Sequence, residues 1–193
     1  MKLANVAVCK VLASSIFMGV SIKLSNVDFQ GLQLGSGQFS CPHLLMLIGV
    51  PGSGKSTLAS QIAAQTAGKI VCCDRIRGEL FGHEAIQGSW GRVWGRVVQE
   101  WQQGIHQKQL VIYDATNARC RYRRQLIAYG RSLGFRRVGG LWLDVPLEVC
   151  LHRNRQRDRQ VDELVITRMY RALEACPPQS RDGWDYLYQI KNL

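Results

Sequence analysis

The 193-residue sequence lacks the patterns with which small proteins bind zinc or cross membranes. Its seven cysteines show no Cys-x-x-Cys spacing and no adjacent group of histidines, which excludes the common zinc modules. Their odd number favours free thiols and a cytoplasmic location. No window approaches the roughly 18 uninterrupted apolar residues of a membrane span, so we expect no membrane partner. At this length the chain suits one domain that needs no disulfides to stay folded.

Acidic residues are scarce. The chain has 14 Asp and Glu against 25 Lys and Arg, a formal net charge of +11. Residues 119–171 alone hold thirteen arginines and five acids. The planar guanidinium of arginine suits phosphate groups, so the excess favours a polyanionic partner. On charge alone, a solvated basic face is an equally good interpretation.

The first 42 residues show no clear periodicity. The apolar stretch at residues 11–20 loosely resembles a secretory signal, but Lys10 interrupts it and no clean cleavage site follows. We therefore expect an N-terminal extension at residues 1–42 and a single domain at residues 43–193.

From residue 43 onward, apolar strands alternate with helical patterns, which predicts an α/β fold with a parallel sheet covered on both faces. Ligands of such sheets bind at the carboxyl ends of the strands. The strands are expected at 44–49, 69–73, 109–113, 136–143 and 185–190, and the helices near 55–66, 75–81, 90–103, 119–132, 146–156 and 162–175.

The segment GVPGSGKST matches the phosphate-binding P-loop pattern G-x-x-x-x-G-K-[ST]. Its glycines let successive backbone N–H groups point at a di- or triphosphate, and the following helix adds its positive end. A glycine-rich turn with a surface lysine is the alternative, but a chance match is on the order of one in a hundred. We expect Lys55 to reach the β and γ phosphates and Ser56 to bind Mg²⁺. The predicted nucleotide-binding residues of this segment are Gly49, Pro51, Gly52, Ser53, Gly54, Lys55, Ser56 and Thr57.

Asp74 closes the second expected strand in IVCCDRIRGELFG. A carboxylate at that position faces the P-loop, where it can take the proton of an attacking hydroxyl. Arg77 follows three residues later and is expected to hold a phosphate of the acceptor. The alternative is that Asp74 only caps a helix. Beside a P-loop, the catalytic interpretation is favoured.

The third expected strand ends in YDATN. An apolar strand that ends in Asp114 is typical of a Walker B strand, whose acid binds Mg²⁺ directly or through water. Thr116 and Asn117 are expected to orient that site or contact the acceptor. A polar turn at the end of a strand is the alternative.

The stretch HRNRQRDRQ at residues 152–160 places four arginines between two expected helices. A cationic segment that closes over a nucleotide stabilises the charge that spreads onto the transferred oxygens. A solvated charged face is the alternative. Its place between the fourth and fifth strands, where small P-loop kinases have a lid, favours the lid.

Trp90, Trp94, Val97 and Trp101 share one stripe of the expected helix at 90–103. Such a stripe can stack nucleic acid bases, with Arg92 and Arg96 close by. Aromatic residues at this spacing are more often part of the core, which is the favoured interpretation.

Together these segments and LDVPLEVCLHRNRQRDRQVDELVITRMYRAL resemble the AAA-family ATP-binding P-loop kinases related to phage-type polynucleotide 5'-hydroxyl kinase and zeta toxins. The resemblance spans about residues 43–190. It implies a P-loop NTPase three-layer sandwich with strand order 2-3-1-4-5 and a small arginine-rich lid. It also implies that Asp74 is the general base, that Arg77 holds the acceptor phosphate, and that Arg157, supported by Arg153, contacts the ATP phosphates. In the phage-type pattern an acid directly precedes Thr-Asn, where this chain has Ala115.

The sequence thus predicts an ATP- and Mg²⁺-dependent kinase whose leading acceptor is a nucleic acid 5'-hydroxyl. A small-molecule kinase that phosphorylates a sugar or nucleotide sugar is the near alternative. A regulator that binds nucleic acid and hydrolyses ATP without transferring phosphate is an alternative from another class.

Overall fold

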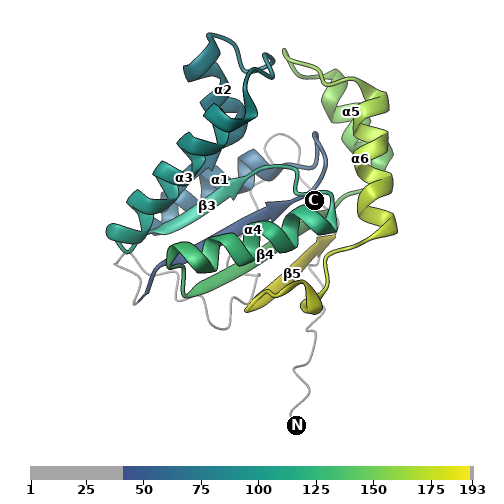
Figure 1. The fold of residues 1–193 in the computed structure, drawn as a ribbon. Helices are drawn as coiled ribbons and strands as arrows, with labels where there is room; N and C mark the ends of the chain where they lie inside the picture. Colours follow the sequence, from purple (N-terminus) through teal and green to yellow (C-terminus); the bar gives the residue numbers. More distant parts are fainter. Residues whose placement is uncertain (1–40, 192–193) are drawn as a thin grey trace.

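Five parallel strands form the centre of residues 41–191, the part of the chain that the computed structural model describes (Figure 1). The predicted strand order 2-3-1-4-5 is confirmed. Apart from residues 41 and 42, the predicted N-terminal extension lies outside the described residues, so the boundary at residue 42 stays a prediction. The strands are β1 (His43–Ile48), β2 (Lys69–Cys72), β3 (Leu110–Asp114), β4 (Arg137–Asp144) and β5 (Tyr186–Lys191).

β1 is the central strand, and all six of its residues are buried. It pairs with β3 on one side and β4 on the other, so that Leu45 lies opposite both Ile112 and Gly139. A strand that is covered on both faces needs apolar residues on both, which is why HLLMLI is a continuous run and does not alternate.

Helices cover both faces of the sheet, as the sequence predicts. In Figure 1, α4 crosses in front of the sheet and α1 lies behind it. None of the helices at residues 41–191 is both long enough and apolar enough to cross a bilayer. The α-helices of these residues are α1 (Lys55–Thr66), α2 (Cys73–Phe81), α3 (Trp90–His106), α4 (Cys120–Leu133), α5 (Leu147–Arg155) and α6 (Glu163–Ala175), and a 3-10 helix, η2 (Ser180–Asp182), precedes β5.

One boundary affects the predicted site. The sequence places Cys73 and Asp74 at the end of the second strand, but β2 ends at Cys72 and α2 begins at Cys73. Cys72 keeps an extended backbone and occupies the N-cap position of α2. Asp74 therefore lies in the first turn of a helix, where the helix dipole favours its negative charge.

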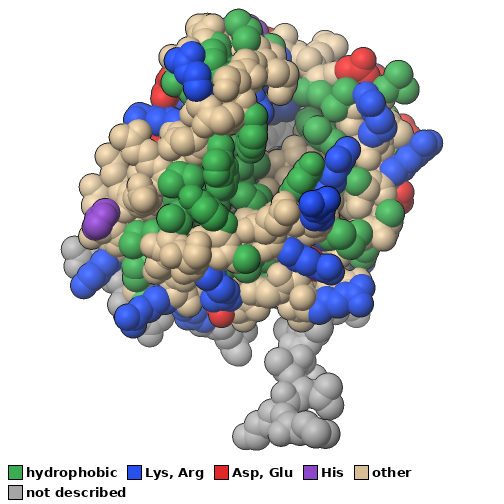
Figure 2. Space-filling model, in the orientation of Figure 1, with side chains coloured by type: hydrophobic (Ala, Val, Ile, Leu, Met, Phe, Trp, Pro, Cys, Tyr) green, Lys and Arg blue, Asp and Glu red, His purple; other side chains and the backbone are tan. Residues whose placement is uncertain are grey.

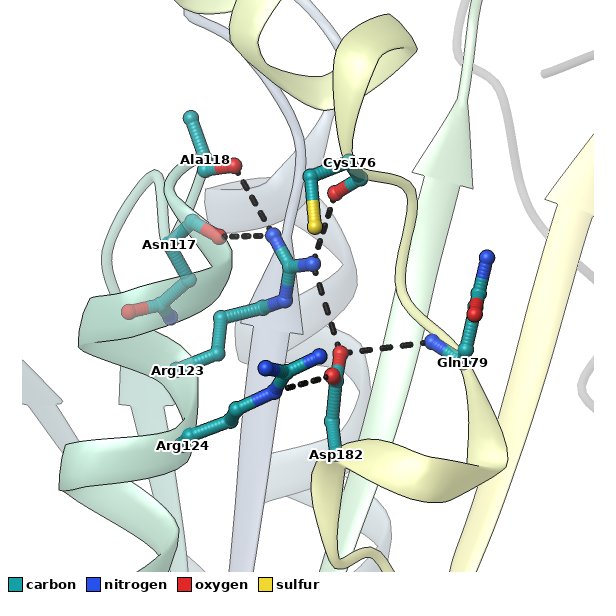
Figure 3. A network of polar contacts seen from close by, with 7 residues as sticks. All are labelled: Asn117, Ala118, Arg123, Arg124, Cys176, Gln179 and Asp182. Atoms are coloured by element: carbon teal, nitrogen blue, oxygen red, sulfur yellow. Dashed lines mark hydrogen bonds and ion pairs between the residues drawn. The ribbon is translucent and has the colours of Figure 1, made fainter.

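A buried arginine joins two distant segments of the chain (Figure 3). Arg123 of α4 is fully buried, and its guanidinium pairs with the carboxylate of Asp182 in η2 at 3.3 Å. The same guanidinium donates to the carbonyl oxygens of Asn117 (3.2 Å), Ala118 (2.8 Å) and Cys176 (2.7 Å). This network fixes the turn between β3 and α4 against the segment that follows α6.

The arginine excess of residues 119–171 is thus not all available to a partner. Arg123 is part of the protein interior, and Arg124, Arg131 and Arg155 form ion pairs with acids of the chain. The six described cysteines are free thiols. Four other arginines of this stretch line the cleft described next: Arg119, Arg157, Arg159 and Arg168.

Candidate functional site

A cleft of about 1640 Å³ opens at the carboxyl ends of β2 and β3. Figure 2 shows the molecule hollowed at the centre of this face, with Lys and Arg side chains around the rim. Single small-ligand sites typically measure about 300 to 1,000 Å³, so this cleft has room for two ligands side by side. Its lining comes from the P-loop, the first turn of α2, the end of β3, the facing sides of α3 and α4, and residues between 156 and 172.

The P-loop follows β1, and its glycines meet specific geometric demands. Gly54 is the N-cap of α1 with φ +96°, in the left-handed region that favours glycine. Gly52 has φ +84°, and a Cβ there would lie 2.2 Å from the carbonyl oxygen of Cys150 in α5. Ser53 is fully buried, whereas Pro51, Ser56 and Thr57 line the cleft. The N-terminus of α1 thereby faces the cleft, as anion binding requires.

Lys55 is the buried cation of the loop. Its Nζ donates to the carbonyl oxygen of Val50 at 2.9 Å, while the residue also lines the cleft. Burial lowers the pKa of Lys55 from 10.5 to about 8, with Asp114 opposing that shift and the positive charge of Arg157 adding to it. A phosphate placed beside this buried ammonium would favour its charged form, which burial disfavours.

Ser56 and Asp114 form the pair that the sequence assigns to Mg²⁺. The Ser56 hydroxyl donates to Asp114 Oδ2 at 2.7 Å, and both residues line the cleft. In the described part of the chain, no three His, Cys, Asp or Glu side chains are grouped to hold a metal by themselves. One hydroxyl and one carboxylate fit Mg²⁺, which keeps several waters and takes its remaining oxygens from substrate phosphates.

Asp74 lines the same cleft as Lys55, and its charge contributes to the pKa of Lys55. Its carboxylate pairs with Arg77 at 2.6 Å and with Arg159 at 3.3 Å. Arg159 also pairs with Glu84 at 2.9 Å, so one arginine from the segment after α5 bridges Asp74 in α2 and Glu84 in the segment that follows α2. The sequence names Arg159 within the arginine run but does not predict this pairing.

Arg77 retains donor capacity after it pairs with Asp74. Its side chain is 14% exposed and lines the cleft, and its Nε has no hydrogen-bond partner among the described residues. A guanidinium with a free buried donor beside an open cleft can bind a phosphate oxygen. The predicted contact of Arg77 with an acceptor phosphate stays a prediction.

The turn after β3 has a structural function that the sequence does not indicate. The backbone N–H of Gly49 donates to the carbonyl oxygen of Thr116 at 3.1 Å, which joins this turn to the P-loop. The Asn117 amide donates to the carbonyl oxygens of Leu47 (2.7 Å) and Ala115 (3.3 Å). Thr116 and Asn117 line the cleft, but the Asn117 donors already have partners, and its contact with an acceptor stays a prediction.

The two arginines predicted to act on the nucleotide lie in different places. Arg157 lines the cleft and lies near enough to lower the pKa of Lys55. Arg153 lies in the last turn of α5 and is not among the described residues that line the cleft. Both assignments, and the lid itself, stay predictions.

The half of the cleft that α3 and α4 form is aromatic. Trp90 and Trp94 of α3 line it, together with Tyr122 and Tyr129 of α4. The two tryptophans belong to the stripe predicted from the sequence, with Val97 and Trp101, whereas the tyrosines do not. Their spacing at i and i+7 in α4 is the only local signal, and it does not reveal which helix they face.

A family model for an AAA domain, AAA_33, matches residues 44–176. A comparison with curated proteins finds no significant match.

Solved structures share the fold at low sequence identity. A chain of the Pnkp1/Rnl/Hen1 RNA repair complex is 22% identical with a TM-score of 0.59, and the match covers 70% of this chain and 45% of that one. A fungal RNA kinase is 16% identical with a TM-score of 0.55, over 79% of this chain and 39% of that one. Shikimate kinase from Acinetobacter baumannii is 19% identical with a TM-score of 0.52, over 80% and 86%. The chain thus spans less than half the length of the two RNA-processing proteins.

Proposed function

The chain belongs to the AAA domain family whose model matches residues 44–176, and we propose that it is an ATP-dependent kinase with a polynucleotide 5'-hydroxyl as its leading acceptor. The observation that carries the proposal is that Lys55 and Asp74 line one cleft, although they follow β1 and β2, which β3 separates in the sheet. A phosphate-binding cation and a potential base thereby share one space, with room for two substrates.

In the proposed reaction, the carboxylate of Asp74 takes the proton of the accepting hydroxyl. The oxygen forms a bond to the γ phosphorus while the bond from that phosphorus to the β–γ bridging oxygen breaks, and ADP leaves. Lys55 holds the β and γ phosphates, and Arg157 stabilises charge on the transferred oxygens. Ser56 and Asp114 would hold Mg²⁺, which neutralises phosphate charge when bound.

The preference for a nucleic acid acceptor rests on charge. Arg77 has a free donor in the cleft, and Arg119, Arg157, Arg159 and Arg168 also line it. Structural neighbours include an RNA kinase and a chain of an RNA repair complex. At their low sequence identity, the likeness to this chain is one of fold alone. The six free thiols also agree with a proposed cytoplasmic location.

A small-molecule kinase is the second candidate. It is favoured by the structural likeness to shikimate kinase, because the match covers 86% of that protein. Labelled ATP offered with 5'-hydroxyl oligonucleotides, sugars and nucleotide sugars separates the two candidates. ATP hydrolysis without any labelled acceptor would instead support the third alternative, a regulator that binds nucleic acid and does not transfer phosphate.

The Asp74→Asn variant tests the proposed chemistry. It should bind ATP normally but transfer phosphate about 10²- to 10⁴-fold more slowly, because amides do not accept the proton. Asp158→Asn is the matched control, since Asp158 is an exposed acid that lines the same cleft and has no proposed role. Normal transfer by Asp74→Asn would show that another group is the base.

A further inference from the structure

One wall of the cleft is aromatic and exposed to water, which is unfavourable in free energy. This aromatic wall consists of Trp90, Trp94, Tyr122 and Tyr129. Trp90 is 54% exposed, Tyr122 52% and Tyr129 37%. Single exposed apolar side chains are ordinary, but a contiguous group in a cleft indicates a binding surface. In Figure 2, hydrophobic side chains gather within the hollow of this face.

The wall is held in place by the core. The rings of Trp90 and Trp94 stack with centroids 6.2 Å apart at an interplanar angle of 21°. Trp94 also contacts Tyr129 of α4 at 5.4 Å and the fully buried Trp101 at 5.7 Å. Because Trp94 is fixed from both sides, Trp90 presents its outer face in a defined orientation and loses little freedom when a flat ligand covers it.

The chemistry of this half of the cleft narrows the ligand. Beside the wall the lining includes Leu126 and the amides Gln87 and Gln125. A sugar or small hydroxy acid would need several hydrogen-bond donors and acceptors here to replace its water, and an aromatic wall does not supply them. A nucleobase has the flat apolar face that stacks on tryptophan and tyrosine.

Charge and position agree with a nucleic acid strand. The guanidinium of Arg119 lies 5.8 Å from the ring centroid of Tyr122, at the edge of the wall. Arg119 lines the same cleft as Arg77 and Lys55, so a continuous path joins the wall to the phosphate end. Proteins that bind single strands combine such cationic tracks with aromatic stacking surfaces.

We propose that the aromatic wall stacks one or more bases at the 5' end of single-stranded nucleic acid, next to the hydroxyl that receives the phosphate. This inference rests on the proposed kinase function and specifies its acceptor. The kinase then distinguishes nucleic acid from small alcohols through the bases and not only through the phosphates.

The test compares Trp90→Ala with wild type on short 5'-hydroxyl single strands, either intact or abasic at the two 5'-terminal positions. One stacked base corresponds to a KM increase of about 5- to 150-fold in the variant, while KM for ATP stays unchanged. Wild type should lose the same factor on the abasic strand, and the variant should lose nothing further there. Ile86→Ala is the control, because Ile86 is 47% exposed and lies just before α3 but not among the cleft-lining residues.

A binding measurement separates this inference from the kinase proposal. Intact strands should quench tryptophan fluorescence in wild type more than abasic strands do, and Trp90→Ala should remove the difference. If binding follows this pattern but no strand is phosphorylated, the wall is supported and the kinase proposal fails. If strands are phosphorylated at equal KM with and without bases, the wall is wrong and the kinase proposal stands. Loss of a dimer in Trp90→Ala, with unchanged strand binding, would also overturn the inference.

Discussion

Replacing Arg123 with methionine removes a charge from the protein interior while it keeps most of the apolar stem. In the folded protein this guanidinium pairs with Asp182 and donates to three carbonyl oxygens, those of Asn117, Ala118 and Cys176. The variant leaves these acceptors without their donor in a site where the Arg123 side chain is fully buried. We expect a large loss of stability.

The contacts of Asp182 set the size of the loss. Removal of one partner of a buried ion pair costs about 3 to 5 kcal/mol when the other charge is left unpaired. Asp182 keeps Arg124 at 2.8 Å and the backbone N–H of Gln179 at 3.3 Å, so its charge remains partly compensated. The lower end, about 3 kcal/mol, is therefore expected. For a protein of this size each kcal/mol lowers Tm by about 2 to 4 °C, which gives a decrease of about 6 to 12 °C.

Thermal unfolding followed by circular dichroism, with urea unfolding as a second measure, tests this value. Arg121→Met is the matched control, because Arg121 is an exposed residue of the same helix. It removes the same charge and should change the unfolding free energy by about 0.5 kcal/mol or less. If Arg123→Met and Arg121→Met melt within about 2 °C of each other, the buried network does not hold the turn and the reasoning is refuted.

Two further predictions concern the phosphate end of the cleft. Burial lowers the pKa of Lys55 to about 8, so the ammonium that binds phosphate is lost as pH rises through that value. We therefore expect kcat/KM for ATP to be level below pH 8 and to fall up to tenfold per pH unit above it. A profile with no break between about pH 7 and 9.5 would contradict this. Asp114→Asn keeps a hydrogen-bond acceptor for Ser56 but loses the negative charge. The Mg²⁺ concentration for half-maximal activity should therefore rise about 10- to 100-fold. An unchanged Mg²⁺ requirement would show that Asp114 does not bind the metal.

The order of the sheet and the P-loop could be predicted because their signals are local. A continuous apolar run predicts β1, and eight adjacent residues define the phosphate loop that follows it. Each strand boundary was predicted to within one residue, and the largest difference at a helix is the end of α3 at His106. One such difference affects a site residue: Asp74 lies in the first turn of α2 and does not close β2. The extended backbone at Cys72 can either end a strand or cap a helix, so the sequence does not distinguish the two.

The function of Arg123 could not be predicted, because its partner Asp182 lies 59 residues away in the sequence. Local composition gives the charge of a segment but not which of its side chains point inward. The same limit applies to Arg159, whose contact with Asp74 spans 85 residues.

Only half of the predicted tryptophan stripe of α3 lies in the hydrophobic core. Val97 and Trp101 are fully buried, as the favoured interpretation expected, whereas Trp90 is 54% exposed in the cleft. Helical periodicity correctly places all four residues on one face. It does not indicate that the first residues of that face, Trp90 and Trp94, line a cleft.

The close approach of Gly52 to Cys150 has a mechanical consequence. The loop that would hold the phosphates rests directly on the backbone of α5, and the next segment of chain after α5 contains Arg157. Closely packed interiors transmit small displacements instead of absorbing them. A nucleotide that displaced this loop would therefore also displace α5, the helix that precedes Arg157.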